Sequence, residues 1–513
     1  MAATKTATEE HISLKVLVDE KKNRVLYVHA GKDFVDILLS FLTLPLGTIA
    51  RLVGKDSNMN KVSVGSLSSL YESVCNMENK HFWTDTCKEM LLQPRSSMES
   101  YCHNIKLNID GTEKTQYFIC QNLKCISNPN VGLLSTFKNQ KCKCGRLMNR
   151  VIHFHSSLAI KNDGYGFVPE TAAFIITDDL KVKPDDFQFS CLLMNHRYED
   201  LDAIKLVTVN VTQKDVLDLL KCSLLSTTPL TDVLLLKKQI IDKLQLGFDF
   251  GIREHDAKSG IQNMKLKVML RKSNKLVLFA LAEEDFVDFI FSFLTFPLGG
   301  VEHMLNGKSC LGSIDNLYKS VLDLDCYRYL RSPDLKEKLV KTPIAHQFKL
   351  HNNILPIDEM PSSNYSHFYK YDSSTKTIVD NSFLTALQEY RSKFIGSFYK
   401  EVYCPLSYLE PPSSNGSKHG GRAFVKKPSL YMVTDDFVVT PSSSFSAVSF
   451  VSNSGVPLSD LEEKVINIGQ KEGLSILKAC LISSSTLTNG LSQFLKIQDE
   501  EKIPSIKKPS LQK

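Results

Sequence analysis

The chain has 513 residues with 62 Lys+Arg against 56 Asp+Glu, which gives a net charge of +6. That excess is too small for the electrostatic footprint of a dedicated nucleic-acid binder. Hydrophobic residues at 42% and charged residues at 23% are ordinary for a folded protein. This composition excludes a chain that is mainly disordered, collagen-like or coiled coil. Domains usually have about 100–200 residues, and we therefore expect two to four folded units.

Cysteine use and the N-terminal sequence favour an intracellular location. The 13 cysteines are unevenly spaced, unlike a secreted disulfide framework. Residues 1–15 lack the apolar core of a signal peptide, and Glu9 and Glu10 are unusual in an organelle transit peptide. We expect a cytoplasmic protein, with the nucleus as the alternative location.

The predicted elements begin with a β-hairpin. Leu14–Val18 and Arg24–His29 alternate apolar and polar residues around a polar four-residue turn. A helix from about Asp33 to Leu44 follows, with Asp33 as its N-cap and Pro45-Leu46-Gly47 as its stop. Apolar residues recur at helical spacing over Leu67–Val74 and predict another helix.

The segment Phe34–Val53 is the part of the chain most similar to a membrane span. Its length fits a bilayer, at roughly 20 residues. Asp36 within the apolar run and the break at Pro45-Leu46-Gly47 favour a buried helix instead. No membrane partner is therefore expected.

The sequence repeats itself after about 250 residues. Leu14–Gly47 and Leu266–Gly299 are identical at 17 of 34 aligned positions, and Val209–Thr231 and Ile466–Thr488 at 10 of 23. These matches predict an α+β fold of two homologous tandem domains, each starting with a β-hairpin followed by helices. The predicted boundaries are residues 1–246 for the first unit, 247–262 for a linker, 263–497 for the second unit and 498–513 for a polar, basic tail.

The later part of each unit carries fewer chemical signals. Thr212 followed by Asp215 predicts a capping box at a helix start. The pairs Asp178-Asp179 and Asp435-Asp436 follow apolar runs, and we expect them to bind local backbone amides in turns rather than a metal ion. The second unit also has an insert without a cysteine cluster at about residues 344–421. Its Ser, Pro and Tyr content over Ile344–Tyr403 and its second loop at Pro411–Gly421 predict surface loops or partly ordered inserts.

Four cysteines give the strongest chemical signal. Their spacing is C-x4-C, a gap of 16 residues, and C-x-C-G, which suits a small zinc-ribbon-like insert at about residues 117–150 of the first unit. Four thiolates leave zinc no open position for water, so we expect a structural zinc ion rather than a catalytic one. Separate buried thiols and a redox-active pair are the alternatives. The predicted metal ligands are Cys120, Cys125, Cys142 and Cys144, with Cys102, His103, His153 and His155 as alternative ligands.

Basic residues surround this cysteine cluster. They can bind phosphate backbones, or they can offset the net −2 charge of a four-thiolate zinc site. Phe118 and Phe137 can stack on bases or form the core of the ribbon. The low net charge does not favour nucleic acid, and an unknown protein partner is the expectation. The basic residues are Lys124, Lys138, Lys141, Lys143, Arg146 and Arg150.

No catalytic signature is present in the sequence. It lacks a P-loop, a G-x-S-x-G elbow and an H-E-x-x-H helix, so no catalytic or cofactor-binding residue is assigned beyond the cysteines. These observations favour a binding or interaction module with a structural zinc site. The alternative is an enzyme with a small-molecule site at the interface of the two repeats.

The repeated block D-F-V-D-x-x-x-S-F-L-T-x-P-L-G resembles a plant family of proteins, domain-of-unknown-function family number 674. The block occupies Asp33–Gly47 and Asp285–Gly299, and the cysteine cluster of the first unit is also similar to the family's pattern. The resemblance covers nearly the whole chain. It implies a plant protein with one or more copies of this unit, and it supplies no activity or catalytic residue.

Overall fold

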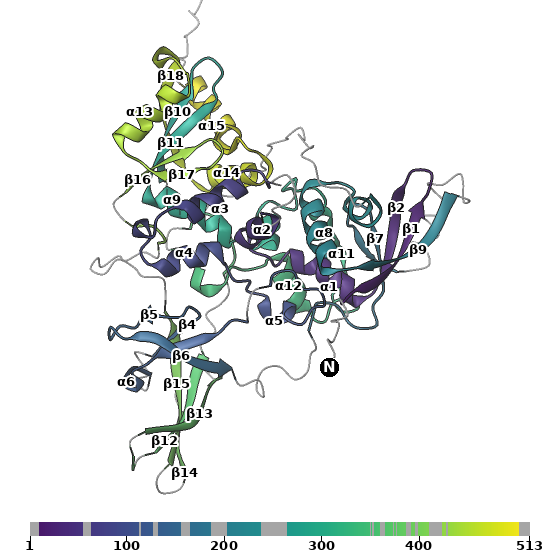
Figure 1. The fold of residues 1–513 in the computed structure, drawn as a ribbon, viewed down its shortest axis with the longest axis vertical. Coiled ribbons are helices and arrows are strands. Elements are labelled where there is room, and N and C mark those ends of the chain that lie inside the picture. The colour runs from purple at the N-terminus through teal and green to yellow at the C-terminus, as the bar shows by residue number, and fades with distance from the viewer. Residues whose placement is uncertain are drawn as a thin grey trace, which may run out of the picture.

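The computed structural model contains two α+β lobes, each around a five-stranded antiparallel sheet, and a smaller β lobe (Figure 1). The predicted linker 247–262 and the tail beyond residue 501 lie outside the described residues, so the domain boundaries stay a prediction. The structure describes residues 10–54, 63–111, 114–126, 132–154, 165–185, 203–236, 264–348, 350, 353–359, 365–372, 374–375, 377–385, 391–395, 399–409, 423–426 and 429–501.

The first sheet has the strand order β8-β7-β2-β1-β9. β1 and β2 pair antiparallel around the turn at residues 20–23, and β1 alternates buried and exposed residues at its start because one face covers the core. Its strands are β1 (Ile12–Asp19), β2 (Arg24–Ala30), β7 (Phe174–Thr177), β8 (Val182–Pro184) and β9 (Ile204–Val211).

The second sheet has the equivalent order β17-β16-β11-β10-β18. β10 and β11 pair antiparallel, and β18 lies on the outer side of β10 as β9 lies on that of β1. The chain is therefore a mixed α+β protein. The strands are β10 (Met264–Arg271), β11 (Val277–Glu283), β16 (Leu430–Thr434), β17 (Val439–Pro441) and β18 (Leu461–Ile468).

Helices cover both sheets and fill the space between them. In the first unit they are α1 (Lys32–Phe41), α2 (Leu46–Val53), α3 (Leu67–Asn76), α4 (Asp85–Leu92), α5 (Glu99–Cys102) and α8 (Gln213–Leu225), with the short turns η1 (Asn79–His81) and η4 (Thr231–Leu236). In the second unit they are α9 (Glu284–Ser292), α10 (Leu298–Met304), α11 (Ile314–Asp323), α12 (Pro333–Val340), α13 (Ser444–Asn453), α14 (Gln470–Ile482) and α15 (Thr486–Glu501), with η5 (Phe293–Thr295), η6 (His346–Phe348) and η7 (Leu458–Asp460).

Two details of the predicted helices are wrong. α1 starts at Lys32 with Gly31 as its N-cap, and Asp33 instead forms a surface ion pair with Lys106 at 2.6 Å. α1 ends at Phe41 rather than Leu44, and Pro45 is the N-cap of a second helix, α2, which the sequence did not predict. The capping box of Thr212 and Asp215 is confirmed. No helix among the described residues is long and apolar enough to cross a membrane.

The repeated Pro-Leu-Gly motif joins the two units. The amide of Leu46 donates to the carbonyl of Phe296, and the amide of Leu298 donates to the carbonyl of Leu44, both at 2.9 Å. Pro45 and Pro297 face each other in an antiparallel bridge between these bonds. The contact is reciprocal, so the same motif contributes the same atoms from both sides.

Each sheet also receives a helix from the other unit. Ser73 on α3 accepts the amide of Val439 on β17, and Ser320 on α11 accepts the amide of Val182 on β8, both at 2.9 Å. The amide of Ser66, just before α3, donates to the carbonyl of Cys480 on α14 of the opposite unit. The amide of Ser313, just before α11, donates to the carbonyl of Ser223 on α8 of the opposite unit. Neither sheet is therefore covered by its own unit alone.

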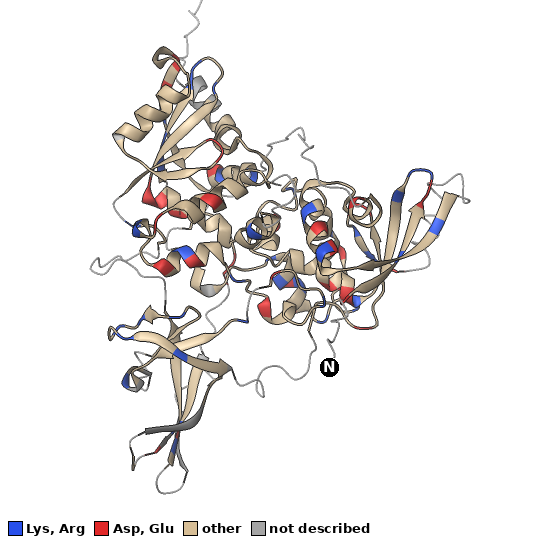
Figure 2. Cartoon of the chain, viewed as in Figure 1, with Lys and Arg blue, Asp and Glu red and all other residues tan. Residues whose placement is uncertain are grey.

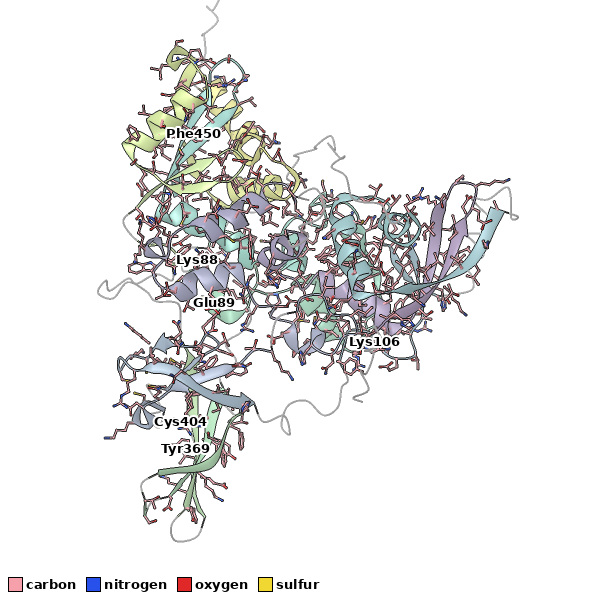
Figure 3. The ribbon with its side chains drawn as sticks, in the orientation of Figure 1. Lys88, Glu89, Lys106, Tyr369, Cys404 and Phe450 are labelled. Atoms are coloured by element: carbon pink, nitrogen blue, oxygen red, sulfur yellow. The ribbon has the colours of Figure 1, made fainter. Side chains whose placement is uncertain are left out.

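The β lobe combines strands from both units into one closed ring. β6 pairs with β13 and β4 pairs with β15 in parallel, while antiparallel pairs β6–β3, β3–β4, β13–β12 and β12–β15 complete the circle. Tyr369 and Cys404 lie together in its interior (Figure 3). Its strands are β3 (Tyr117–Cys120), β4 (Leu133–Ser135), β5 (Gln140–Lys141), β6 (Leu147–Phe154), β12 (Tyr365–Asp372), β13 (Thr377–Thr385), β14 (Arg391–Ile395) and β15 (Tyr399–Tyr408), with β5 paired to β6 and β14 to β15.

This arrangement corrects the prediction that the insert of the second unit forms surface loops. Strands β12 to β15 occupy much of residues 365–408, and β12 contains fully buried side chains such as Ser366 and His367. The Ser and Tyr content was a poor guide, because the backbone of β12 pairs with a neighbouring strand on each of its two edges, β13 and β15. Composition does not reveal such pairing.

We expect Gly299→Ala to destabilise the junction between the units. A Cβ at Gly299 would lie 2.7 Å from the carbonyl oxygen of Leu339 and 3.0 Å from that of Leu42. Overpacking of this kind costs about 1–3 kcal/mol, so the thermal unfolding midpoint should fall. Gly31→Ala is the control, because nothing lies within 4 Å of the position that its added methyl carbon would take. Equal midpoints for the two variants would contradict the junction.

We also expect residues 1–246 and 263–513 not to fold cooperatively when expressed apart. Each piece would lack the helix that covers its sheet, α11 or α3. Amide hydrogen exchange is the measurement, with the mixed pieces as the control. Strong protection of β1 or β10 in an isolated piece would show that the exchanged helices are dispensable.

Candidate metal centre

The cysteine pairs lie on two short loops of the β lobe. Cys120 ends β3, and the amide of Asn122 donates to its sulfur at 3.3 Å. Cys125 follows on the one-turn helix α6 (Leu123–Ile126). Short sequence separation therefore brings the first two thiols together without long-range contacts.

The second pair lies on the turn of the β5–β6 ribbon. The amide of Cys142 donates to the carbonyl of Arg146 at 2.9 Å, and the amide of Gly145 donates to the carbonyl of Cys142 at 2.8 Å. Gly145 has φ +84°, a left-handed conformation that glycine adopts at little cost. Gly145 therefore allows the tight turn that brings Cys142 and Cys144 together.

The two loops bring all four predicted cysteines into one cluster. Their sulfur atoms lie within 4.8 Å of one another, and the sulfurs of Cys120 and Cys144 are 3.6 Å apart. Cys120 and Cys142 are buried, Cys125 is half-buried and Cys144 is exposed. The cluster is therefore able to hold a metal ion.

The sulfur atoms are close enough together for one ion to reach them. A zinc–sulfur distance of about 2.3 Å implies sulfur–sulfur distances of roughly 3.8 Å, and the sulfurs of Cys120 and Cys144 are 3.6 Å apart. A disulfide requires about 2.05 Å, and all four cysteines are free. The donor set thus fits a soft divalent metal.

The thiols also differ in their acidity before a metal binds. Burial, together with hydrogen bonds from neighbouring thiols, raises the pKa of Cys120 to about 12 and that of Cys125 to about 11. The backbone amide of Arg146 lowers the pKa of Cys144 to about 7. Metal binding requires thiolates, so a metal ion would replace the protons of this cluster.

The alternative ligands lie elsewhere or are not described. Cys102 and His103 line a small pocket with Thr43, whose hydroxyl lies 3.4 Å from the sulfur of Cys102. His153 is exposed on β6, and His155 lies outside the described residues. The cluster is complete without them.

That pocket is too small for a metabolite. Its volume of about 30 Å³ holds one or two water molecules. Its lining comes from residues 40–44 and 95–110, all within the first unit. It therefore does not lie at the interface of the repeats, where the enzyme hypothesis needs a site.

Phe118 and Phe137 are buried, so the hypothesis that they stack on bases is wrong. Phe118 belongs to the β-lobe core. Phe137 contacts the ring of Phe348 edge-on at 6.1 Å and joins the main core. Both aromatic side chains hold the lobe together and anchor it to the body of the protein.

A family model matches this chain over residues 8–471, and its description is "Protein of unknown function (DUF674)". The chain belongs to the DUF674 family. No curated protein and no solved structure matches it significantly. The repeated block and the cysteine cluster are thus features of a DUF674 protein, whose activity has to be inferred from its residues.

The first acid of each pair binds a distant threonine rather than the local amides that we predicted, whereas Asp179 and Asp436 accept from the nearby hydroxyls of Thr177 and Thr434. Asp178 accepts hydrogen bonds from the amide and hydroxyl of Thr231, at 2.9 and 2.8 Å. Asp435 makes the same two contacts with Thr488, at 2.7 and 2.9 Å. Each acid therefore ties the end of a strand to a helical segment that follows later in the chain, through a threonine 53 residues away.

One buried acid was missed by the sequence reasoning. Glu302 on α10 is fully buried, and its Oε1 contacts Ser309, whose hydroxyl oxygen is 2.8 Å from Asp315. The hydroxyl has one proton for two carboxyl groups, so a protonated Glu302 supplies the second. Burial, followed by the charge of Asp315, raises the pKa of Glu302 well above its usual range. Ala50 occupies the equivalent position of the first unit, so the repeat gave no signal.

We expect Glu302→Gln to flatten the pH dependence of stability. Because the folded-state pKa is raised, the contribution of Glu302 is present below an unfolded pKa of about 4.3 and is lost as the pH rises through the folded-state pKa. The variant should unfold at a higher temperature than the wild type at pH 8 but not at pH 4. Thermal melts against pH are the measurement, with the exposed Glu463→Gln as the control. Parallel wild-type and variant curves would contradict a protonated Glu302.

Proposed function

We propose that this protein is a binding module whose β lobe is braced by one structural zinc ion. The supporting observation is the convergence of four thiol sulfurs within 4.8 Å at the β5–β6 ribbon. All four positions of a tetrahedral zinc ion would be filled by sulfur, which leaves no site for a substrate water. Zinc would therefore stabilise the β lobe and fix the shape of its cysteine loops rather than take part in a reaction.

The position of the cysteine cluster supports an interaction role. The cluster lies at loops of the β lobe rather than in the central core, at the end of this lobe where Gln140 on β5 contacts Thr86 on α4 (Figure 1). Cys144, Arg146 and Leu147 in its turn are exposed. A short ribbon of this kind cannot bury enough apolar surface to hold a fixed shape alone, and a metal ion would supply that rigidity.

The proposed location is the cytoplasm or the nucleus, and the proposed partner is a macromolecule rather than a metabolite. No feature of the described residues favours the alternative of an enzyme with a site between the repeats. Backbone groups fill the junction there, since a Cβ at Gly47 would lie 2.9 Å from the carbonyl oxygen of Leu294.

We expect the purified full-length protein to contain about one zinc per chain. Cys142→Ser/Cys144→Ser should remove it, because two of the four ligands are lost. Elemental analysis is the measurement, and Cys75→Ser is the matched control because Cys75 is an exposed cysteine outside the cluster. A well-folded wild-type protein without metal would overturn the zinc proposal.

A further inference from the structure

The excess positive charge of the whole chain is concentrated in the segment that forms the cysteine cluster. Residues 117–154 contain six Lys and Arg and no Asp or Glu. The rest of the chain has 62 − 6 = 56 basic against 56 acidic residues. The net charge of +6 is therefore local, and the whole-chain value hides it.

Five of these six cations are exposed around the cluster. Figure 2 shows Lys and Arg along β5, β6 and α6. Arg150 differs from the others because it is half-buried on β6. The five exposed cations, called the basic tip below, are Lys124, Lys138, Lys141, Lys143 and Arg146.

The negative charge of a metal-bound cysteine cluster would offset only part of the positive charge of residues 117–154. Four thiolates and one divalent ion carry a net charge of −2, which leaves 6 − 2 = +4 on the segment. The offset of thiolate charge therefore explains only part of the basic tip. The remainder is free to attract a polyanion.

The shape of the tip narrows the choice of polyanion. β5 and the start of β6 form a short antiparallel hairpin of two residue pairs, Gln140 with Met148 and Lys141 with Leu147, whose turn carries Lys143 and Arg146. The major groove of B-form DNA is about 12 Å wide and admits such a ribbon, whereas the deep, narrow major groove of duplex RNA does not. Single strands need exposed aromatic side chains for stacking, and Phe118 and Phe137 are buried.

We propose that the basic tip binds the phosphate backbone of double-stranded DNA, with the β5–β6 ribbon directed at the major groove. This inference rests on the proposed binding function and names its partner. The contacts are cation to phosphate, so recognition depends on charge and groove shape rather than on base sequence.

The test is fluorescence anisotropy of the full-length protein with a short random-sequence DNA duplex. Five phosphate contacts predict that log K falls with log salt with a slope of about −4.5. In the triple variant Lys138→Gln/Lys141→Gln/Lys143→Gln we expect a slope less steep by about 2.7 and on the order of 100-fold weaker binding at about 0.1 M salt. Its zinc content should equal that of the wild type.

The matched control removes the same charge elsewhere. The control variant is Lys15→Gln/Lys265→Gln/Lys267→Gln, whose three lysines are exposed on the sheets of the two α+β lobes. It should bind DNA as tightly as the wild type. Equal losses in both triple variants would overturn the basic tip as the binding surface. Equal or tighter binding to duplex RNA, to the single strand or to phosphatidylserine vesicles would overturn the assignment to DNA.

Metal analysis separates this inference from the proposed function. If the wild-type protein contains zinc but does not bind the DNA duplex, only the DNA inference is overturned. A folded, metal-free protein that binds the duplex through the same lysines overturns only the zinc brace.

Discussion

The reciprocal contact between the two Pro-Leu-Gly motifs sets the position of everything else. Two backbone hydrogen bonds, Leu46 to Phe296 and Leu298 to Leu44, hold the ends of α1 and η5 against each other. Each bond contributes only about 1 kcal/mol. Gly47 and Gly299 beside these bonds allow the backbones to approach closely, because a Cβ at either position would meet a backbone carbonyl oxygen. From this point α3 and α11 reach across to the opposite sheets. The repeated motif is therefore an interface as well as a helix stop.

The same exchange places the β lobe. Strands β3, β4 and β6 come from the first unit, and β12, β13 and β15 come from the second. The lobe closes through two short parallel contacts, Phe383 with His153 and Ser407 with Leu133 among them. A metal ion at the β5–β6 ribbon would stabilise the half whose strands β3, β4 and β5 are short, with 4, 3 and 2 residues. The β14 hairpin occupies the corresponding place in the other half.

Local chemistry made part of this structure predictable. The hairpin strands, the capping box at Thr212 and the four-cysteine cluster each depend on residues close together in sequence, so their patterns carry the information. The exchange of helices was not predictable. Ser66 and the carbonyl of Cys480 are joined by a bond that neither segment encodes alone, because the partner is chosen by the packing of the whole chain. For the same reason the buried strands of residues 365–408 looked like loops.

The exchanged helices have a consequence for synthesis of the chain on the ribosome. Val182 on β8 and Ser320 on α11 are separated by 138 residues. At about 5–20 residues per second, translation would separate them by roughly 7–28 s. During that interval the apolar face beside β8 has no helix to cover it, so the nascent first sheet is exposed to aggregation and to chaperones. A fold that shares its helices thus delays completion of its first half until its second half exists.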